Sequence, residues 1–399
     1  MNHDAAATLR VAAGLALAAA VSLGLARFSY ALLLPAMRAD LGWSYLTAGA
    51  MNTVNATGYL IGALFTPRWL ARHDARALLL AGSVVTAGLL AAHGLVLGEA
   101  ALAVLRLLSG VTSAVMFISG GLLAARLVAG PSIDAARTAT VSAGLVLGIY
   151  YGGTGVGIIA SAAIVPAVTA LPLAHAWQWA WLTLAAAALL ATAAMARATR
   201  RVASAAPAPG TGTRFRWYRF AYGLAAYLMF GLGYIGYMTF VVTLLREQGL
   251  SSALIVAFYA LLGSGVVASS WIWAGTLQRF RGGEALALLN ALLALATLLP
   301  VLSAHPVLVF ASGALFGSVF LSLVASTTAL VRHNLPPAAW PGGIAAFTIV
   351  FAAGQIVGPS AVGWVADGPG GLARGFVCSA AVLALGSLLA WRQKPLATA

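Results

Sequence analysis

The stretch "GLARFSYALLLPAMRADLG" (residues 24–42) recurs in the second half of the chain as "GLGYIGYMTFVVTLLREQG" (residues 231–249). The two stretches align without a gap, so that Gly24 meets Gly231, Tyr30 meets Tyr237 and Gly42 meets Gly249. A pattern that returns once, half a chain later, indicates an internal duplication.

Other matches follow in the same order. Gly148, Gly152 and Gly157 pair with Gly354, Gly358 and Gly363, and Gly62, Leu64 and Arg68 pair with Gly275, Leu277 and Arg281. These matches predict two related six-helix halves, an arrangement found in secondary transporters.

Composition identifies the environment of these helices. The chain is 62% hydrophobic and only 8% charged, whereas soluble domains carry about 25% charged residues. Apolar runs of bilayer length, roughly 20 residues, recur throughout. The fold class we predict is an all-α polytopic membrane protein with twelve transmembrane helices in two six-helix repeats. They lie at about 10–36, 43–67, 77–97, 100–128, 135–168, 176–197, 217–245, 252–277, 284–304, 306–331, 338–366 and 372–392.

The longest polar break divides the chain into three predicted parts. Residues 1–197 form an N-terminal six-helix half, 198–216 a cytoplasmic linker, and 217–399 a C-terminal six-helix half. Of the 22 lysines and arginines, only Arg38, Arg246 and Arg374 then fall in outer loops, and Arg27 and Arg106 within spans. The remaining cations lie on the inner side, so the positive-inside rule places both termini in the cytoplasm. We expect a multi-pass protein of the bacterial cytoplasmic (inner) membrane.

The charge placement also bears on partners. The formal net charge of +14 is a topology signal and does not indicate nucleic acid. Cys378 is the only cysteine, and the sequence contains no metal-ligand spacing or phosphate-binding loop. No histidine falls near the centre of a span, so we expect no cofactor, no metal and no enzymatic activity. The expected partners are a small-molecule substrate and the lipid bilayer, and the expected state is a monomer.

Two neighbouring stretches carry a family resemblance. "ARFSYALLLPAMRADLGWS" (26–44) followed by "AGAMNTVNATGYLIGAL" (48–64) resembles the YbfB/YjiJ-type branch of the major facilitator superfamily, and "RLLSG" (106–110) matches the superfamily's Arg-x-x-x-Gly element. The resemblance implies alternating access, with two halves rocking around a central cavity that helices 1 and 4 border.

The loops after helices 2 and 8 match the superfamily in part. "GALFTPRWLAR" (62–72) and "GTLQRFRGG" (275–283) resemble its Gly-x-Leu-x-Asp-Arg-x-Gly-Arg pattern. Thr66 and Arg279 stand where that pattern has Asp.

Arg27 and Arg106 are charges inside predicted spans. A charge at the centre of a helix costs roughly 2.5–3.5 kcal/mol on insertion scales, and both residues fall about 10 Å below the outer helix ends. All eight acidic residues lie in or beside loops. Because a guanidinium keeps its charge and suits carboxylate or phosphate, both arginines are candidates to bind an anionic substrate. Snorkelling toward the interface and structural hydrogen bonds are the alternatives for Arg27, and a structural role is the alternative for Arg106.

Polar residues elsewhere in the spans extend this candidate site. Asn52, Asn55 and Tyr59 share one helix face, which suits either a cavity lining or helix–helix contact. The further predicted substrate-binding residues are Tyr30, Tyr150, Tyr151, Tyr234, Tyr237 and Gln355.

A second set of residues is expected to serve gating and conformational change. They are Gly62, Arg68, Gly144, Gly148, Gly152, Gly275, Arg281, Gly354, Gly358 and Pro359. Tight helix packing alone is the alternative for the glycines. Glu99 is the candidate for proton coupling.

The function predicted from these residues is secondary active or facilitative transport of a small anionic organic solute by alternating access. The alternative within transport is proton-coupled efflux of amphipathic, drug-like compounds. A non-transporting membrane receptor and a polytopic membrane enzyme are the alternatives of another class.

Overall fold

A computed structural model describes residues 3–128, 142–200, 202, 215–336 and 339–396, which form helices and no strands. Most of the predicted linker over 198–216, and the first residues of the predicted fifth helix, lie outside these ranges.

The described residues of the first half form six long helical segments. They are α1 (His3–Ala19), continued by η1 (Ala20–Phe28) and α2 (Tyr30–Leu41); α3 (Tyr45–Leu70); α4 (Ala75–His93); α5 (Glu99–Val128); α7 (Ala143–Thr169); and α8 (Ala176–Ala198).

The second half repeats this order. Its helices are η2 (Trp217–Phe220), continued by α9 (Ala221–Glu247); α10 (Ser252–Ile272), followed by the short α11 (Ala274–Arg279); α12 (Glu284–Leu302); α13 (Pro306–Asn334); α14 (Trp340–Ala366); and α15 (Gly371–Trp391). The predicted fold class is confirmed.

Length and composition qualify 11 of the described helical stretches as candidate membrane spans. The helix α3 is not among them, because its asparagines and threonines dilute the apolar residues. Two other differences from prediction have local causes. The third predicted helix ends at His93, four residues early, in a turn at Gly94, and the eighth is interrupted at Trp273 between α10 and α11.

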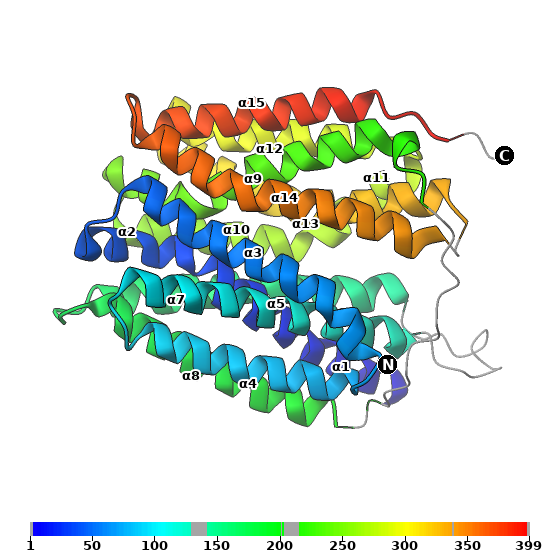
Figure 1. The fold of residues 1–399 in the computed structure, drawn as a ribbon, viewed down its shortest axis with the longest axis horizontal. Coiled ribbons are helices and arrows are strands. Elements are labelled where there is room, and N and C mark those ends of the chain that lie inside the picture. The colour runs from blue at the N-terminus through cyan, green and yellow to red at the C-terminus, as the bar shows by residue number, and fades with distance from the viewer. Residues whose placement is uncertain (1–2, 129–141, 201, 203–214, 337–338, 397–399) are drawn as a thin grey trace. The chain divides into compact units, whose positions relative to one another are not determined.

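The helices form two compact units (Figure 1). Unit 1 comprises Met1–Ala36 and Thr57–Pro207, and unit 2 comprises Met37–Ala56 and Ala208–Ala399. The unit boundary therefore cuts through α2 and α3, and the segment 37–56 is counted with the C-terminal helices.

The same helix pairs pack in both units. In unit 1, α1 packs on α7 and α8, and α4 packs on α5 and α8. In unit 2, α9 packs on α14 and α15, and α12 packs on α13 and α15. The corresponding helices thus make corresponding contacts, as the sequence repeat leads one to expect.

Glycines bring specific helices into backbone contact. A Cβ built on Gly153 would lie 2.0 Å from the carbonyl oxygen of Ala16, and one on Gly157 would lie 2.3 Å from that of Ala20. In unit 2, Gly354 and Gly358 approach α9 in the same way, each with a backbone oxygen at 2.6 Å. A Cβ built on Gly144 would meet nothing within 4 Å, so the close approach of α7 begins after this glycine, nearer to Gly153.

The segment 37–56 is fastened within unit 2 by polar contacts. The Asp367 carboxylate accepts hydrogen bonds from the backbone N–H groups of Tyr45 (2.7 Å) and Leu46 (2.9 Å), at the N-terminus of α3. The Tyr45 hydroxyl donates to the Glu247 carboxylate, which lies 3.8 Å from the Arg38 guanidinium. A free helix N-terminus favours a carboxylate in this position.

Candidate functional site

Arg27 lies near the end of a π-helical segment. In η1 the turns are wider than in an α-helix, and the Ser29 N–H donates to the Gly24 carbonyl at 3.1 Å, five residues back. All nine residues of η1 are buried. The sequence predicts a regular helix here, and the π segment is a departure from that prediction. Such segments are rare and occur frequently at functional sites.

Side chains from two neighbouring helices donate hydrogen bonds to the carbonyls of η1. On α5, the Ser113 hydroxyl donates to Ser22 at 2.9 Å and the Arg106 Nη1 donates to Ala26 at 3.2 Å. On α7, the Ser161 hydroxyl is shared between the Gly24 carbonyl at 3.2 Å and the Gly157 carbonyl of its own helix at 2.9 Å. The segment is buried, so its carbonyls need hydrogen-bond donors from the protein, and these bonds stabilise the wide turns. Ser113 and Ser161 were absent from the sequence-based candidates, although a hydroxyl in an apolar span was the available signal.

The Arg106 side chain is 1% exposed. Its guanidinium carbon lies 4.4 Å from the centre of the Tyr30 ring, in cation–π distance. Together with the bond to Ala26, this contact makes Arg106 a positioning residue for η1. The Tyr30 ring that contacts Arg106 is also buried, with 1% exposure.

The Arg27 side chain is 4% exposed. Its guanidinium carbon lies 5.3 Å from the centre of the Tyr59 ring and 6.0 Å from that of Phe28. Tyr59 belongs to the part of α3 in unit 1, so unit 1 brings together the predicted residues Arg27, Arg106, Tyr30 and Tyr59.

The two tyrosines of α7 differ in environment. Tyr150 is fully buried, and its hydroxyl donates to the Phe117 carbonyl at 2.5 Å. Tyr151 is 37% exposed, and its ring centre lies 5.2 Å from that of Tyr150. Tyr150 therefore holds α7 against α5, whereas the accessible Tyr151 is the better candidate for ligand contact.

Asn52 and Asn55 belong to unit 2, whereas Tyr59 on the same helix belongs to unit 1. The Asn52 Nδ2 donates to the Thr239 hydroxyl at 2.7 Å, which ties the segment 37–56 to α9. Asn55 is 1% exposed. Asn52 thus serves packing within its unit.

The remaining predicted residues of unit 2 lie in a ring-rich interior. Tyr237 stacks on Phe316 with centres 4.0 Å apart, and its hydroxyl shares a 2.7 Å hydrogen bond with Ser312. Tyr234, at the position that Arg27 has in the first repeat, stacks between Phe230 (4.7 Å) and Phe320 (5.2 Å). Gln355 is 3% exposed on α14.

The predicted gating residues include both tightly packed and exposed positions. Gly62 packs against the backbone of α5, since an added Cβ would lie 2.4 Å from the Val111 carbonyl oxygen. Arg68, Gly275 and Arg281 are exposed, and an added Cβ at Gly275 would meet nothing within 4 Å. The carbonyl oxygen of Pro359 faces Gly49 at close range. Gly148 and Gly152 are buried in α7.

Glu99, the candidate for proton coupling, is the exposed first residue of α5. A carboxylate there complements the helix dipole, and the role of Glu99 in proton coupling stays a prediction.

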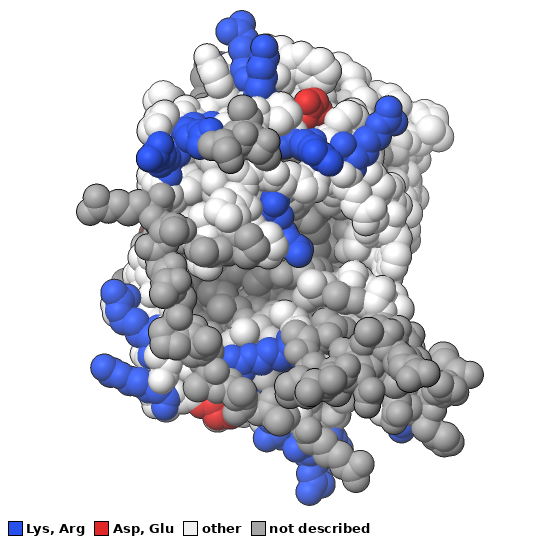
Figure 2. Space-filling model, turned by 90° about the vertical axis from the view of Figure 1, so that its right-hand side faces the viewer, with Lys and Arg blue, Asp and Glu red and all other residues white. Residues whose placement is uncertain are grey.

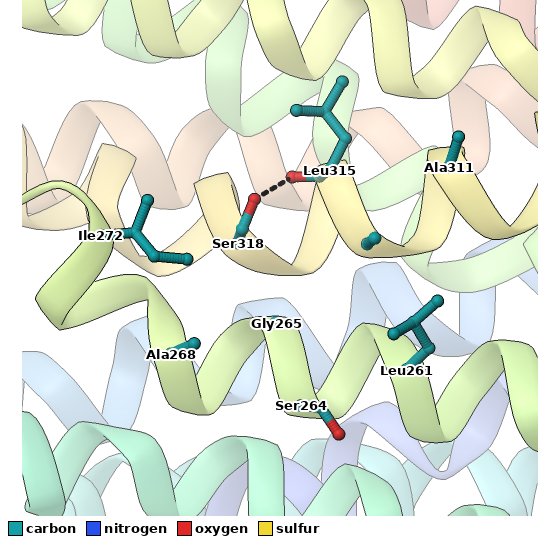
Figure 3. A pocket seen from close by; sticks show the side chains of 9 residues that line it. Leu261, Ser264, Gly265, Ala268, Ile272, Ala311, Leu315 and Ser318 are labelled. Carbon is teal, nitrogen blue, oxygen red and sulfur yellow. Dashed lines mark hydrogen bonds between the residues drawn. The ribbon is translucent and has the colours of Figure 1, made fainter.

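Unit 2 also has an apolar groove of about 470 Å³ between α10 and α13 (Figure 3). Its two hydroxyls bond to carbonyls of their own helices, Ser318 to Leu315 at 2.9 Å and Ser264 to Ala260 at 2.9 Å. A groove lined by small and aliphatic side chains with internally bonded hydroxyls offers a polar solute no recognition, so we do not assign the substrate to it.

Solved structures that share the fold include three transporter structures. The nucleoside transporter NupG has a TM-score of 0.67 at 15% identity, covering 99% of this chain and 100% of that one. A NupG point mutant has a TM-score of 0.69 at 13% identity, covering 96% and 98%. A bacterial homologue of the human lysosomal transporter Spinster, inward-facing and unoccupied, has a TM-score of 0.67 at 13% identity, covering 98% and 97%.

No curated protein matches the sequence. The profile of a protein family, described as the uncharacterised MFS-type transporter YbfB, matches residues 19–391. That match spans nearly the whole chain, and the relatives of known fold are transporters, not enzymes. The protein therefore belongs to the YbfB family of major facilitator superfamily transporters and moves a small solute across a membrane.

Proposed function

We propose that the solute is a small organic anion and that Arg27 binds it. The observation that carries this proposal is the buried Arg27 guanidinium, placed by the π-helical segment and set 5.3 Å from the Tyr59 ring. An arginine fork is shaped for carboxylate, sulfonate or phosphate oxygens.

The chemistry around the two buried arginines supports an anion over a cation. Aromatic rings and a backbone carbonyl contact the two guanidinium groups. A ring quadrupole or a carbonyl dipole stabilises a cation but carries no formal negative charge, so these contacts leave the positive charge in place. In the described helices of unit 1 the acidic side chains stand at helix ends, as Glu99 does. The local field favours a negatively charged ligand.

Arg106 has a different part in this proposal. Its hydrogen bond to Ala26 and its contact with Tyr30 fix the turn that carries Arg27. Arg27 is then the ligand contact, and Arg106 positions it.

The test is uptake by the purified protein in liposomes, with a panel of organic acids and, as comparison, organic cations. We expect uptake of an acid by the native protein and its loss in Arg27→Ala, because the variant lacks the only group proposed to pair with the anion. Arg27→Lys should retain part of the activity, since it keeps the charge but not the planar fork.

The control is Arg10→Ala, which removes an exposed arginine of α1 whose Nε donates to the Ala6 carbonyl. It should transport as the native protein does. Undiminished uptake by an Arg27→Ala variant with native melting temperature would overturn the proposal.

A second candidate function, proton-coupled efflux of amphipathic compounds, rests on the stacked rings of unit 2. Phe351, the half-buried member, lies 4.9 Å from Tyr227, 5.1 Å from Phe230 and 5.6 Å from Tyr234. Efflux of an aromatic cationic dye that collapses when the proton gradient is dissipated would favour this function over anion transport.

A further inference from the structure

A small basic pocket lies in unit 2 at the junction of η2 with the connection from α13 to α14. Its volume is about 190 Å³. It is lined by two arginines, Arg216 and Arg219, and by apolar residues that include Phe215, Phe220, Leu335 and Ala339.

The apolar side of the pocket is firmly packed. Phe220 is 1% exposed, and its ring stacks on Phe215 with centres 5.3 Å apart. Its other neighbour is Phe347 on α14, at 6.1 Å. The Leu335 carbonyl accepts a 2.9 Å hydrogen bond from the Trp340 indole N–H. The pocket is thus a formed cavity with a hydrophobic wall.

The polar side of the pocket carries positive charge. Arg216 is exposed and Arg219 half-buried, and the backbone of Arg219 is anchored by the Gln393 side chain, which donates to its carbonyl at 3.2 Å. Within the part of the chain that the structure describes, no salt bridge joins Arg216 or Arg219 to a carboxylate. Neither guanidinium of the pocket is neutralised by a described carboxylate, so both are available to an external anion.

Exposed aromatic residues beside the pocket indicate that it lies at the level of the lipid headgroups. Trp217, Tyr218 and Tyr222 are 46%, 72% and 47% exposed. Exposed tryptophan and tyrosine concentrate at the headgroup level of a membrane, where their rings face lipid and their polar atoms face water. Lipid phosphates lie at that same level. Several lysine and arginine side chains are visible on the face drawn in Figure 2.

We propose that this pocket binds an anionic phospholipid, with the lipid phosphate held by Arg216 and Arg219 and the start of its acyl chains against Phe215 and Leu335. Guanidinium forks bind phosphate oxygens with charge-assisted hydrogen bonds, and a basic pocket beside helix ends is suited to acidic headgroups. An apolar wall next to the arginines matches an amphiphile better than a free ion. The inference is independent of the transported solute.

Native mass spectrometry of the full-length protein, titrated with phosphatidylglycerol or with phosphatidylcholine of identical chains, tests the proposal. We expect saturable binding of one phosphatidylglycerol with at least about tenfold preference over phosphatidylcholine. Arg216→Gln combined with Arg219→Gln should weaken phosphatidylglycerol binding about tenfold or more. The corresponding double Lys variant should keep most of the binding, because it keeps the charge.

The matched control is Arg279→Gln combined with Lys394→Gln, which removes the same formal charge from exposed residues of unit 2 outside the pocket. It should bind as the native protein does. Equal weakening in this control, or equal binding of both lipids, would overturn the proposal. So would displacement of the lipid by millimolar inorganic phosphate, which would indicate a free-anion site. Melting temperatures in lipid-free detergent identify any variant that fails to fold, and the preference of the native protein for phosphatidylglycerol over phosphatidylcholine then carries the test.

Discussion

Corresponding positions of the two repeats hold different chemistry. Arg27 in the first repeat and Tyr234 in the second occupy the same place in the duplicated stretch. Arg27 contacts the ring of Tyr59, whereas Tyr234 stacks within a column of rings. The duplicated fold therefore needs no charge at this position, and Arg27 is a specialisation of the first repeat.

Removal of the ring beside Arg27 should weaken substrate binding. Cation–π contacts are worth about 0.5–2 kcal/mol, which corresponds to a roughly 2–30-fold increase in KM. We expect that increase for Tyr59→Leu, because the guanidinium loses the face that orients it. The measurement is initial uptake rate against substrate concentration in liposomes.

Tyr59→Phe is the matched control, because it keeps the ring and loses only the hydroxyl. It should transport with near-native KM. If Tyr59→Phe is as impaired as Tyr59→Leu, the hydroxyl and not the ring contributes to binding.

Single residues of the site were predictable only where their chemistry conflicts with a bilayer. Arg27 and Arg106 stand out because a charge in an apolar run is costly. Their separate roles did not follow from sequence, because the Arg106 bond to Ala26 depends on how α5 packs against η1. The asparagines of α3 share a helix face with Tyr59, yet Asn52 bonds to Thr239. Periodicity places residues on a face but does not say which helix covers it.

At the scale of elements, helix positions were the most predictable feature. Runs of apolar residues and the loops between them reproduce the described helices closely, because bilayer thickness fixes their length. The π segment was not predictable. Its residues, "AVSLGLARF", suit an α-helix equally well, and the wide turns depend on donors from α5 and α7 that lie far away in sequence.

The contact between η1 and α7 leaves no room for a side chain. A Cβ on Gly157 would lie 2.3 Å from the Ala20 carbonyl oxygen and 2.8 Å from the Gly24 Cα. Gly157→Ala should therefore separate the two helices and destabilise the fold by about 1–3 kcal/mol. A lower melting temperature in detergent is the expected result.

Gly144→Ala on the same helix is the matched control. No atom lies within 4 Å of its added Cβ, and alanine is favoured over glycine in a helix by up to about 1 kcal/mol. Its melting temperature should be unchanged or higher. A native melting temperature for Gly157→Ala would contradict the tight contact.

At the scale of the whole molecule, the distribution of arginines leads to an orientation that labelling can test. Arg374 and Lys394 are exposed near opposite ends of α15. If both termini are cytoplasmic, a membrane-impermeant maleimide should label Arg374→Cys in intact spheroplasts and Lys394→Cys only after the membrane is broken. The native protein, which carries the single exposed Cys378 in α15, is the background control. The reverse labelling pattern would contradict the predicted topology.

The hydrogen bonds from Tyr45 and Leu46 to Asp367 have a consequence for biogenesis. They join residues separated by 322 and 321 positions. At a synthesis rate of about 5–20 residues per second, the start of α3 is made roughly 16–64 s before the carboxylate that caps it exists. The N-terminal part of α3 must therefore enter the membrane before Asp367 and the helices around it have been synthesised. Unit 2 can be completed only when the last part of the chain has left the ribosome. The helices of unit 2 therefore cannot assemble in the order in which they are translated.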